Sequence, residues 1–212
     1  MTGFLINEPD GAPWAHLILT HGASEPVDGA FLTTIAEGLA AQGVRVARFE
    51  FDYLAQRRTG GLKRPPPKMP VLEEELFGRL AEYGPAGPLF IGGKSMGGRV
   101  SSLIADQAYG AGQIAGVLCY GYPFHPSGKP ESLRTAHLKD LRAPMLVCHG
   151  TRDPLGTAEE VAGYDLSGQI EIQWLEDGDH GFKPRKRSGF TLDDHMTRAI
   201  EASADFMRRH AG

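Results

Sequence analysis

The sequence predicts an α/β protein with a mostly parallel, doubly wound sheet of about six to seven strands flanked by helices. Three observations lead to this fold class. Short apolar runs recur along the chain, segments of helical character lie between many of them, and no internal repeat or clear linker interrupts the alternation. Strands that alternate with helices form a mostly parallel sheet that is covered on both faces. A chain of 212 residues fits one such domain, spanning residues 1–212.

Six apolar runs have the character of buried strands. In chain order they are residues 15–20, 44–51, 88–93, 114–124, 143–150 and 170–175. Four other segments are interpreted as helices, namely residues 29–43, 70–84, 95–110 and 191–210. The first helix places Phe31, Ile35 and Leu39 on one face, and the last is amphipathic with a basic final turn. The irregular segment 55–70 is expected to be a surface loop, because strands continue on both sides of it.

Composition and charge exclude several classes of protein. Apolar residues make up 41% of the chain and charged residues 23%, which indicates a soluble globular domain. A formal net charge of −4 argues against nucleic-acid binding, which needs a basic surface. Cys119 and Cys148 lie in apolar runs and are expected to be reduced core residues, and there is no zinc-type CxxC pair. We find neither a signal peptide nor an apolar run of the roughly 20 residues that span a bilayer, so we expect a cytoplasmic protein without a membrane partner.

Residues 92–99, with the sequence GGKSMGGR, contain two overlapping motifs that assign different chemistry to Ser95. A phosphate-binding loop would need a glycine where this chain has Pro88, and a flexible turn where the chain has a strand. The pattern Gly-x-Ser-x-Gly between a strand and a helix instead predicts a tight turn that exposes a nucleophilic serine. Its glycines let the helix start close to the strand. We therefore interpret Ser95 as a nucleophile.

A serine hydroxyl is a weak nucleophile that needs a base, and the base needs an orienting carboxylate. On a sheet of this kind the order along the chain is serine, acid, histidine. Asp153 and His180 each follow a predicted strand, so both are expected at the carboxyl edge of the sheet together with Ser95. Two alternatives remain open from the residues alone. Asp153 could be only a turn residue before a proline, and His149 could be the base.

The oxyanion that develops during acyl transfer needs hydrogen-bond donors. One donor is the backbone N–H of the residue after the nucleophile, here Met96, and the other comes from a loop after an early strand. The run that starts at Ala15 ends in His-Gly-Ala-Ser, and we favour the N–H of Ala23 over that of Ser24 as the second donor. The alternative is that this stretch is only a glycine turn.

These motifs together resemble the α/β-hydrolase superfamily. They are the THGAS loop, the GGKSMGGR turn, HGTRDPLG around Asp153 and GDHGF around His180, and the resemblance covers nearly the whole chain. The chain is most similar to short, lidless, dienelactone-hydrolase-like members. More narrowly, it resembles small bacterial hydrolases related to a regulatory subunit of the nonspecific-lethal histone-acetylation complex. The resemblance implies Ser95 as nucleophile, His180 as base and Asp153 as orienter, although true dienelactone hydrolases have a cysteine in place of Ser95.

The site is expected to be open, because residues 125–142 are too few for the helical lid that lipases insert at this place. No cofactor or metal is expected. Basic residues near the site, including the run 183–187, could favour anionic substrates by charge steering, and the alternative is a solvated basic loop. Four side chains are candidates for contact with a substrate, either by lining the pocket or by bracing it: Lys94, Asp52, Tyr53 and Arg57.

The function predicted from the sequence is a carboxylesterase-like serine hydrolase that acts on a small-molecule acyl substrate through an acyl-enzyme intermediate. Two alternatives are a catalytically weak interaction module on the same fold and a small peptidase. The complete set of Ser95, Asp153 and His180 favours an enzyme over an interaction module. The small size of the chain argues against a peptidase by analogy only.

Overall fold

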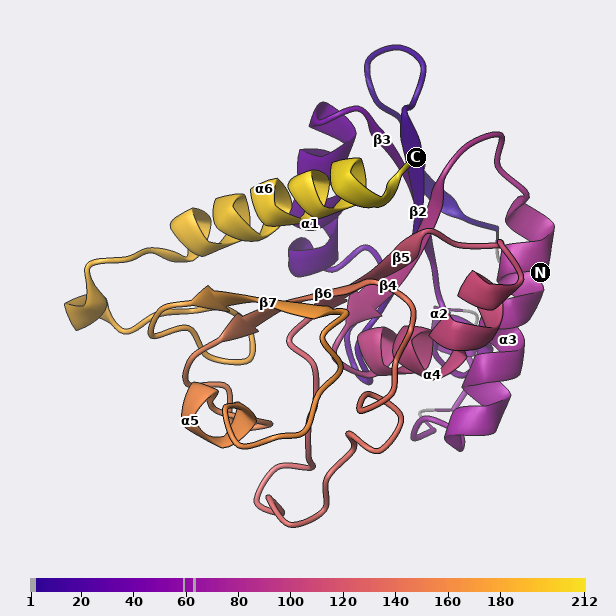
Figure 1. Cartoon of the computed structure of the whole chain (residues 1–212). Coiled ribbons are helices and arrows are strands. Elements are labelled where there is room, and N and C mark those ends of the chain that lie inside the picture. Colours follow the sequence, from indigo (N-terminus) through magenta and orange to yellow (C-terminus); the bar gives the residue numbers. More distant parts are fainter. Residues whose placement is uncertain (1–2, 59, 63) are drawn as a thin grey trace.

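A computed structural model describes residues 3–58, 60–62 and 64–212 of the chain. Seven strands form one sheet in the order β1-β3-β2-β4-β5-β6-β7 (Figure 1). The strands are β1 (Leu5–Asn7), β2 (Ala15–Thr20), β3 (Val44–Phe49), β4 (Leu89–Lys94), β5 (Gly116–Tyr120), β6 (Met145–Gly150) and β7 (Ile170–Leu175). Neighbouring strands are parallel except at one edge, where β1 runs antiparallel to β3. The predicted mostly parallel sheet is confirmed.

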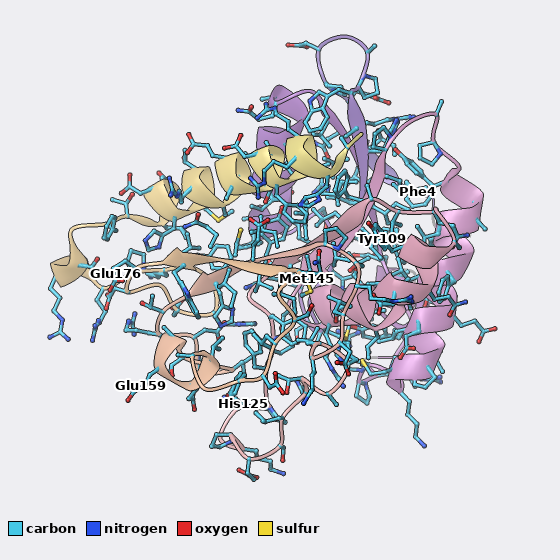
Figure 2. All side chains as sticks on the ribbon, in the orientation of Figure 1. Phe4, Tyr109, His125, Met145, Glu159 and Glu176 are labelled. Carbon is cyan, nitrogen blue, oxygen red and sulfur yellow. The ribbon has the colours of Figure 1, made fainter. Side chains whose placement is uncertain are left out.

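Helices cover both faces of this sheet. They are α1 (Ala30–Ala41), α2 (Asp52–Arg58), α3 (Met69–Tyr83), α4 (Met96–Gly110), α5 (Ala158–Val161) and α6 (Leu192–His210), with a short 3₁₀ turn η1 (Lys186–Ser188). Helices α1 and α6 pack together on one face, and α3 and α4 pack together on the other (Figure 1). Side chains fill the space between sheet and helices on both faces (Figure 2). None of the described helices is long and apolar enough to cross a bilayer.

Two strands end earlier than the sequence predicted. The strand expected at 114–124 stops at Tyr120, because Gly121 has a φ of 68° that takes the chain out of the sheet. The strand expected at 44–51 stops at Phe49. Both changes bring the following residues to the carboxyl edge of the sheet, where the candidate site lies.

The loop predicted at 55–70 is wrong in its first part, since α2 continues as far as Arg58. Only two residues of this seven-residue helix are buried, which is too few to produce a helical hydrophobic pattern in the sequence. The strand β1 was also missed, because alternation of apolar and polar residues cannot be recognised over a segment of three residues. Thr59 and Lys63 lie outside the described residues.

The two cysteines lie on neighbouring strands of the core. Cys119 on β5 and Cys148 on β6 are both buried free thiols, which confirms the prediction of reduced core residues. Burial raises the pKa of both thiols, that of Cys148 to about 12. Neither thiol therefore has the low pKa that a reactive cysteine needs.

The connection from β5 to β6 contains no helix within residues 125–142, all of which are described. Leu138 and Leu141 are buried and anchor this connection to the core beside α4. No helical lid covers the carboxyl edge from this connection, as the sequence predicted.

Candidate active site

Ser95 occupies a sharp turn between β4 and α4. Its backbone has φ 50° and ψ −110°, a conformation that residues other than glycine seldom adopt. The Ser95 N–H donates to the Tyr120 carbonyl on β5, and the Arg99 N–H donates to the Ser95 carbonyl, both at 3.0 Å. The residues before Ser95 pair with β2 and β5, so their N–H groups are not free to bind phosphate. The strained turn that the sequence predicted is present.

The glycines around Ser95 are required by close packing. A Cβ atom at Gly93 would lie 2.4 Å from the Thr20 hydroxyl oxygen, and one at Gly97 would lie 2.1 Å from the same atom. A Cβ atom at Gly97 would also lie 2.7 Å from the carbonyl oxygen of His21. Real Cβ atoms do not approach other atoms this closely, so only glycine lets α4 begin against the end of β2.

Asp153 and His180 are joined by a hydrogen bond in which His180 Nδ1 donates to Asp153 Oδ2 at 2.7 Å. Asp153 follows β6 and has no exposed side-chain surface, while the His180 side chain follows β7 and is 30% exposed. The second carboxylate oxygen of Asp153 accepts the Leu155 N–H at 2.9 Å. Because Nδ1 carries the proton, Nε2 of His180 is free to accept one.

The carboxylate of Asp153 is held in its ionised form. Burial alone raises the pKa of Asp153, but the hydrogen bond from His180 and the nearby imidazoles of His149 and His180 lower it by more. The net shift is downward, so Asp153 can orient a neutral imidazole and stabilise the imidazolium that forms when a proton is accepted.

The turns that carry Ser95 and His180 are in direct contact. The Lys94 ammonium, adjacent to Ser95 in the chain, donates to the carbonyl oxygen of His180. A Cβ atom at Gly121 would lie 2.7 Å from Lys94 Nζ and 3.2 Å from His180 Nδ1. No hydrogen bond between the Ser95 hydroxyl and the imidazole is found in the described part of the chain. Such bonds are often long in enzymes without substrate.

His149, the alternative base, lies behind the acid. It is fully buried, donates from Nε2 to the Gly156 carbonyl at 2.8 Å, and has the same nitrogen 3.7 Å from Asp153 Oδ2. Burial, more than any other cause, lowers its pKa. A fully buried imidazole whose N–H is bound to a carbonyl does not reach a substrate, so this geometry favours His180 as the base.

The two predicted oxyanion donors are linked by Tyr53. The Tyr53 hydroxyl donates to the carbonyl oxygen of Ala23 at 2.9 Å and lies 3.9 Å from the sulfur of Met96. Met96 is the first residue of α4, where backbone N–H groups have no partner within the helix. The Ala23 N–H has no partner among the described residues. A Cβ atom at Gly22 would lie 3.8 Å from Ser95 Cβ, which places this loop beside the nucleophile.

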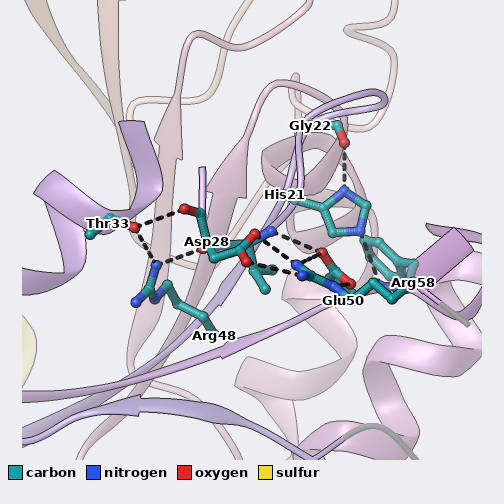
Figure 3. A network of polar contacts seen from close by, with 9 residues as sticks. His21, Gly22, Asp28, Thr33, Arg48, Glu50 and Arg58 are labelled. Atoms are coloured by element: carbon teal, nitrogen blue, oxygen red, sulfur yellow. Dashed lines mark hydrogen bonds and ion pairs between the residues drawn. The ribbon is translucent and has the colours of Figure 1, made fainter. Parts of the chain in front are cut away.

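His21 anchors the start of the loop between β2 and α1 (residues 21–29), which carries the predicted donor Ala23 and is called the oxyanion loop below. The sequence did not indicate this role of His21. Its Nε2 accepts the Phe51 N–H at 3.1 Å, so its Nδ1 carries the proton and donates to the Gly22 carbonyl at 2.5 Å (Figure 3). Burial is the main cause of its lowered pKa, which keeps the imidazole neutral in this arrangement. A histidine directly before the Gly-Ala of the loop was the only signal that could have indicated it.

A carboxylate and an arginine anchor the other end of the loop. The buried carboxylate of Glu50 accepts the Val27 N–H at 3.2 Å and two hydrogen bonds from Arg58, each 2.6 Å long (Figure 3). Arg58 also pairs with Asp28 at 2.7 Å. Burial raises the pKa of Glu50, but the bonds from Arg58 and Val27 lower it by more, so Glu50 is ionised. The charge of Arg58 is therefore neutralised and does not steer substrates.

The four candidates for substrate contact lie in different surroundings. Asp52 is exposed, Tyr53 braces the oxyanion loop, and the Arg57 guanidinium lies 5.8 Å from the centre of the Tyr53 ring. Lys94 is only 6% exposed, and this burial argues against its predicted contact with substrate. A cavity of about 290 Å³ lies beside the oxyanion loop and is lined by Ser24, Pro26, Glu50, Leu54, Arg57 and Arg58.

The basic run 183–187 is partly neutralised. Arg185 forms an ion pair with Asp177. That hydrogen-bonded ion pair lowers the pKa of Asp177 and raises the pKa of Arg185. The pairing of Arg185 therefore favours the interpretation that this run is a solvated basic loop, and argues against a patch that steers anionic substrates.

Comparison with known proteins identifies the same fold over the whole site. A model of the family described as an alpha/beta hydrolase domain matches residues 13–208, which include every residue assigned to the candidate site.

Several solved structures share this fold at low sequence identity. The esterase domain of a Rhodothermus marinus protein has a TM-score of 0.67 and 19% identity, covering 99% of this chain and 93% of that one. A serine hydrolase without lid from Xanthomonas campestris has a TM-score of 0.68 and 18% identity, covering 97% and 88%. A dienelactone hydrolase from Anabaena variabilis has a TM-score of 0.69 and 18% identity, covering 98% and 91%. At these identities the likenesses establish the fold and leave the substrate open.

Proposed function

Because the chain belongs to the alpha/beta hydrolase domain family, we propose that it is a serine hydrolase that cleaves small soluble esters through an acyl-enzyme intermediate. One observation carries this proposal. A strained Ser95 with φ 50° lies at the same edge of the sheet as an imidazole hydrogen-bonded to a buried carboxylate, at 2.7 Å. A strained nucleophile beside an oriented base is the arrangement that acyl transfer needs.

The proposed reaction begins when the Ser95 hydroxyl oxygen attacks the ester carbonyl carbon while His180 Nε2 accepts the hydroxyl proton. The N–H groups of Met96 and Ala23 stabilise the oxyanion of the tetrahedral intermediate. When the intermediate collapses, the ester C–O bond breaks, and the imidazolium returns its proton to the departing alkoxide. Asp153 holds the imidazole in the correct tautomer and stabilises its cation throughout.

The acyl group then leaves in a second, equivalent step. A water molecule gives a proton to His180 as it attacks the acyl-enzyme, and the second tetrahedral intermediate collapses to a carboxylic acid and a free Ser95 hydroxyl. This chemistry is complete with side chains and water, and no step calls for a cofactor.

Small soluble esters are the proposed substrate class because no helical lid arises from residues 125–142 to cover the carboxyl edge of the sheet. A long acyl chain would have little apolar surface to contact there. The chain resembles dienelactone hydrolases in its fold. Because its candidate nucleophile is a serine and not the cysteine of true dienelactone hydrolases, we propose simple esters as substrates in preference to dienelactones. The narrower likeness to hydrolases related to the nonspecific-lethal complex subunit is a further hypothesis, which adds no substrate.

Labelling with a fluorophosphonate probe tests this proposal. Trypsin is expected to cut after Lys94 and after Arg99, which releases the peptide Ser-Met-Gly-Gly-Arg with Ser95 as its only serine. We expect the adduct in this peptide, no adduct in Ser95→Ala, and wild-type labelling in the control Ser132→Ala, which changes an exposed serine. Ser95→Ala should also lose on the order of 10⁶ in turnover of short esters. Folded protein without an adduct on Ser95 would contradict the proposal and favour an interaction module.

A further inference from the structure

Lys94 immediately precedes the candidate nucleophile, yet its side chain points into the protein. It is 6% exposed. Its ammonium lies 4.8 Å from the ring centre of Phe31 on α1 and 4.9 Å from that of Phe182, which follows His180. The same ammonium donates a hydrogen bond to the carbonyl oxygen of His180. One buried cation therefore connects the end of β4, helix α1 and the turn that carries the base.

A buried ammonium at this place is costly to the folded protein. Burial is the main cause that lowers the pKa of Lys94, from the usual 10.5 to about 8, although the carboxylates of Asp153, Glu25 and Asp179 act in the opposite direction. None of the described carboxylates forms an ion pair with Lys94. An apolar side chain would fill the same space between two phenylalanine rings without the desolvation cost. The stability of the fold therefore does not explain why a lysine occupies this position.

The contacts of Lys94 converge on the base. A Cβ atom at Gly121 would lie 2.7 Å from Lys94 Nζ and 3.2 Å from both the Nδ1 and the carbonyl oxygen of His180. The ammonium, the imidazole and the main chain of the histidine turn thus meet around one glycine. Since Lys94 is bonded through its backbone to Ser95, its side chain sets the distance between the nucleophile and the turn that presents the base.

We propose that Lys94 is a positioning residue of the hydrolase, whose ammonium holds the carbonyl of His180 and thereby places the imidazole against Ser95. This role rests on the proposed function. The protonated form is the active one, because only a charged amine is attracted strongly to the faces of Phe31 and Phe182 while it donates to the carbonyl. A displacement of about 1 Å between nucleophile and base can cost on the order of 100-fold in rate.

The charges that face Lys94 come from every element packed against it. Asp153 lies after β6, Asp179 and His180 lie after β7, Glu25 lies on the oxyanion loop, and His149 lies at the end of β6. The three carboxylates in this set favour the protonated form of Lys94. The loss of the Lys94 proton at alkaline pH is therefore expected to loosen the His180 turn and lower turnover.

The first test replaces Lys94 with methionine, which fills the aromatic site without charge. With a short p-nitrophenyl ester, Lys94→Met is expected to lower kcat about 10- to 100-fold and to change KM less than threefold. Fluorophosphonate labelling of Ser95 should slow as well, because attack by Ser95 needs the same base, while the midpoint of thermal unfolding does not fall. The exposed Lys183, three residues after His180, provides the matched control, and Lys183→Met is expected to keep wild-type kcat.

The pH profile of kcat distinguishes a positioning role of the Lys94 charge from a purely structural role, because only the positioning role makes kcat depend on the protonation of Lys94. We expect wild-type kcat to decline above a pH of about 8, the control Lys183→Met to show the same decline, and Lys94→Met to lack it. Lys94→Arg keeps a cation that does not titrate below pH 12, so it is expected to retain more activity than Lys94→Met and to lack the decline. If Lys94→Met does not fold, the comparison of the alkaline decline in the wild type and in Lys94→Arg still tests the proposal.

Two outcomes would overturn the inference. One is a wild-type kcat in Lys94→Met, and the other is an unchanged alkaline decline in Lys94→Met or Lys94→Arg. Failure of the underlying function is distinguishable, because then the wild-type protein itself would show no adduct on Ser95. If wild-type Ser95 is labelled and Lys94→Met is labelled at the same rate, only the positioning role fails.

Discussion

Replacement of Lys94 by methionine is expected to make the protein more stable although it makes the enzyme slower. The folded state lowers the pKa of Lys94 from 10.5 to about 8. A shift of that size corresponds to roughly 3 kcal/mol by which folding disfavours the charged side chain, at about 1.4 kcal/mol per pKa unit. The side chain is buried, so solvent screens little of this cost. Lys94→Met is expected to raise the free energy of unfolding at pH 7 by about 1 to 3 kcal/mol, with methionine filling the space between Phe31 and Phe182.

The dependence on pH has a definite sign. Between pH 8 and the unfolded pKa of 10.5, the unfolded state binds more protons at Lys94 than the folded state does. The free energy of unfolding therefore increases with pH across this window, and the cost of the buried charge is fully present below a pH of about 8. The difference in unfolding free energy between Lys94→Met and the wild type should consequently shrink as the pH rises from 8 to 10.5.

Urea denaturation followed by far-UV circular dichroism measures this difference. Wild type, Lys94→Met and the control Lys183→Met are compared at pH 7 and pH 10, where all other titrating groups cancel in the differences. Lys183→Met is expected to match the wild type at both values. A Lys94→Met protein less stable than the wild type by more than about 1 kcal/mol at pH 7 would refute the reasoning, as would a difference that does not depend on pH.

Three further changes test the site. Gly97→Ala would place a Cβ atom 2.1 Å from a side-chain oxygen of β2, and is expected to cost on the order of 3 kcal/mol or more in thermal or urea unfolding and to abolish Ser95 labelling. Gly110→Ala, on the same helix with nothing within 4 Å, is the control and should be neutral. Tyr53→Phe removes the 2.9 Å hydrogen bond to the Ala23 carbonyl, and should lower kcat about twofold to tenfold in steady-state assays while the urea midpoint changes little. An unchanged kcat would show that Tyr53 does not support the oxyanion donors. Asp153→Asn keeps the size of the side chain that contacts the imidazole but removes its negative charge, and should lower kcat by a factor on the order of 10⁴. A loss of less than tenfold would indicate that the acid is misassigned.

Long periodic segments and glycine-rich turns were predictable from the sequence. The strands at 15–20 and 170–175 match β2 and β7 in both bounds, because apolar runs of strand length with turn residues on either side carry the signal. The turn at Ser95 was predictable because its geometry demands glycines at fixed offsets, and those glycines are visible in the sequence. Asp153 and His180 were recognisable because each directly follows a predicted strand, in the chain order that accompanies a serine in this kind of turn.

Side-chain direction and long-range partners were not predictable. Nothing in the sequence shows that Lys94 turns inward between Phe31 and Phe182, which are separated by 151 positions along the chain. The buried Glu50 and its partner Arg58 looked like residues of a strand and a loop, and only the chain path places both against the oxyanion loop. The short helix α2 escaped detection because it buries too few residues for a periodic pattern.

The central claim is that Ser95 carries the acyl group during turnover. Its most direct test is an acid quench in the first turnover of p-nitrophenyl acetate, followed by tryptic digestion and mass spectrometry. The account predicts a burst of p-nitrophenol close to one equivalent and an acetyl group on the peptide Ser-Met-Gly-Gly-Arg, residues 95–99, with neither in Ser95→Ala. An acetyl group on another residue, or turnover that survives in Ser95→Ala, would contradict it.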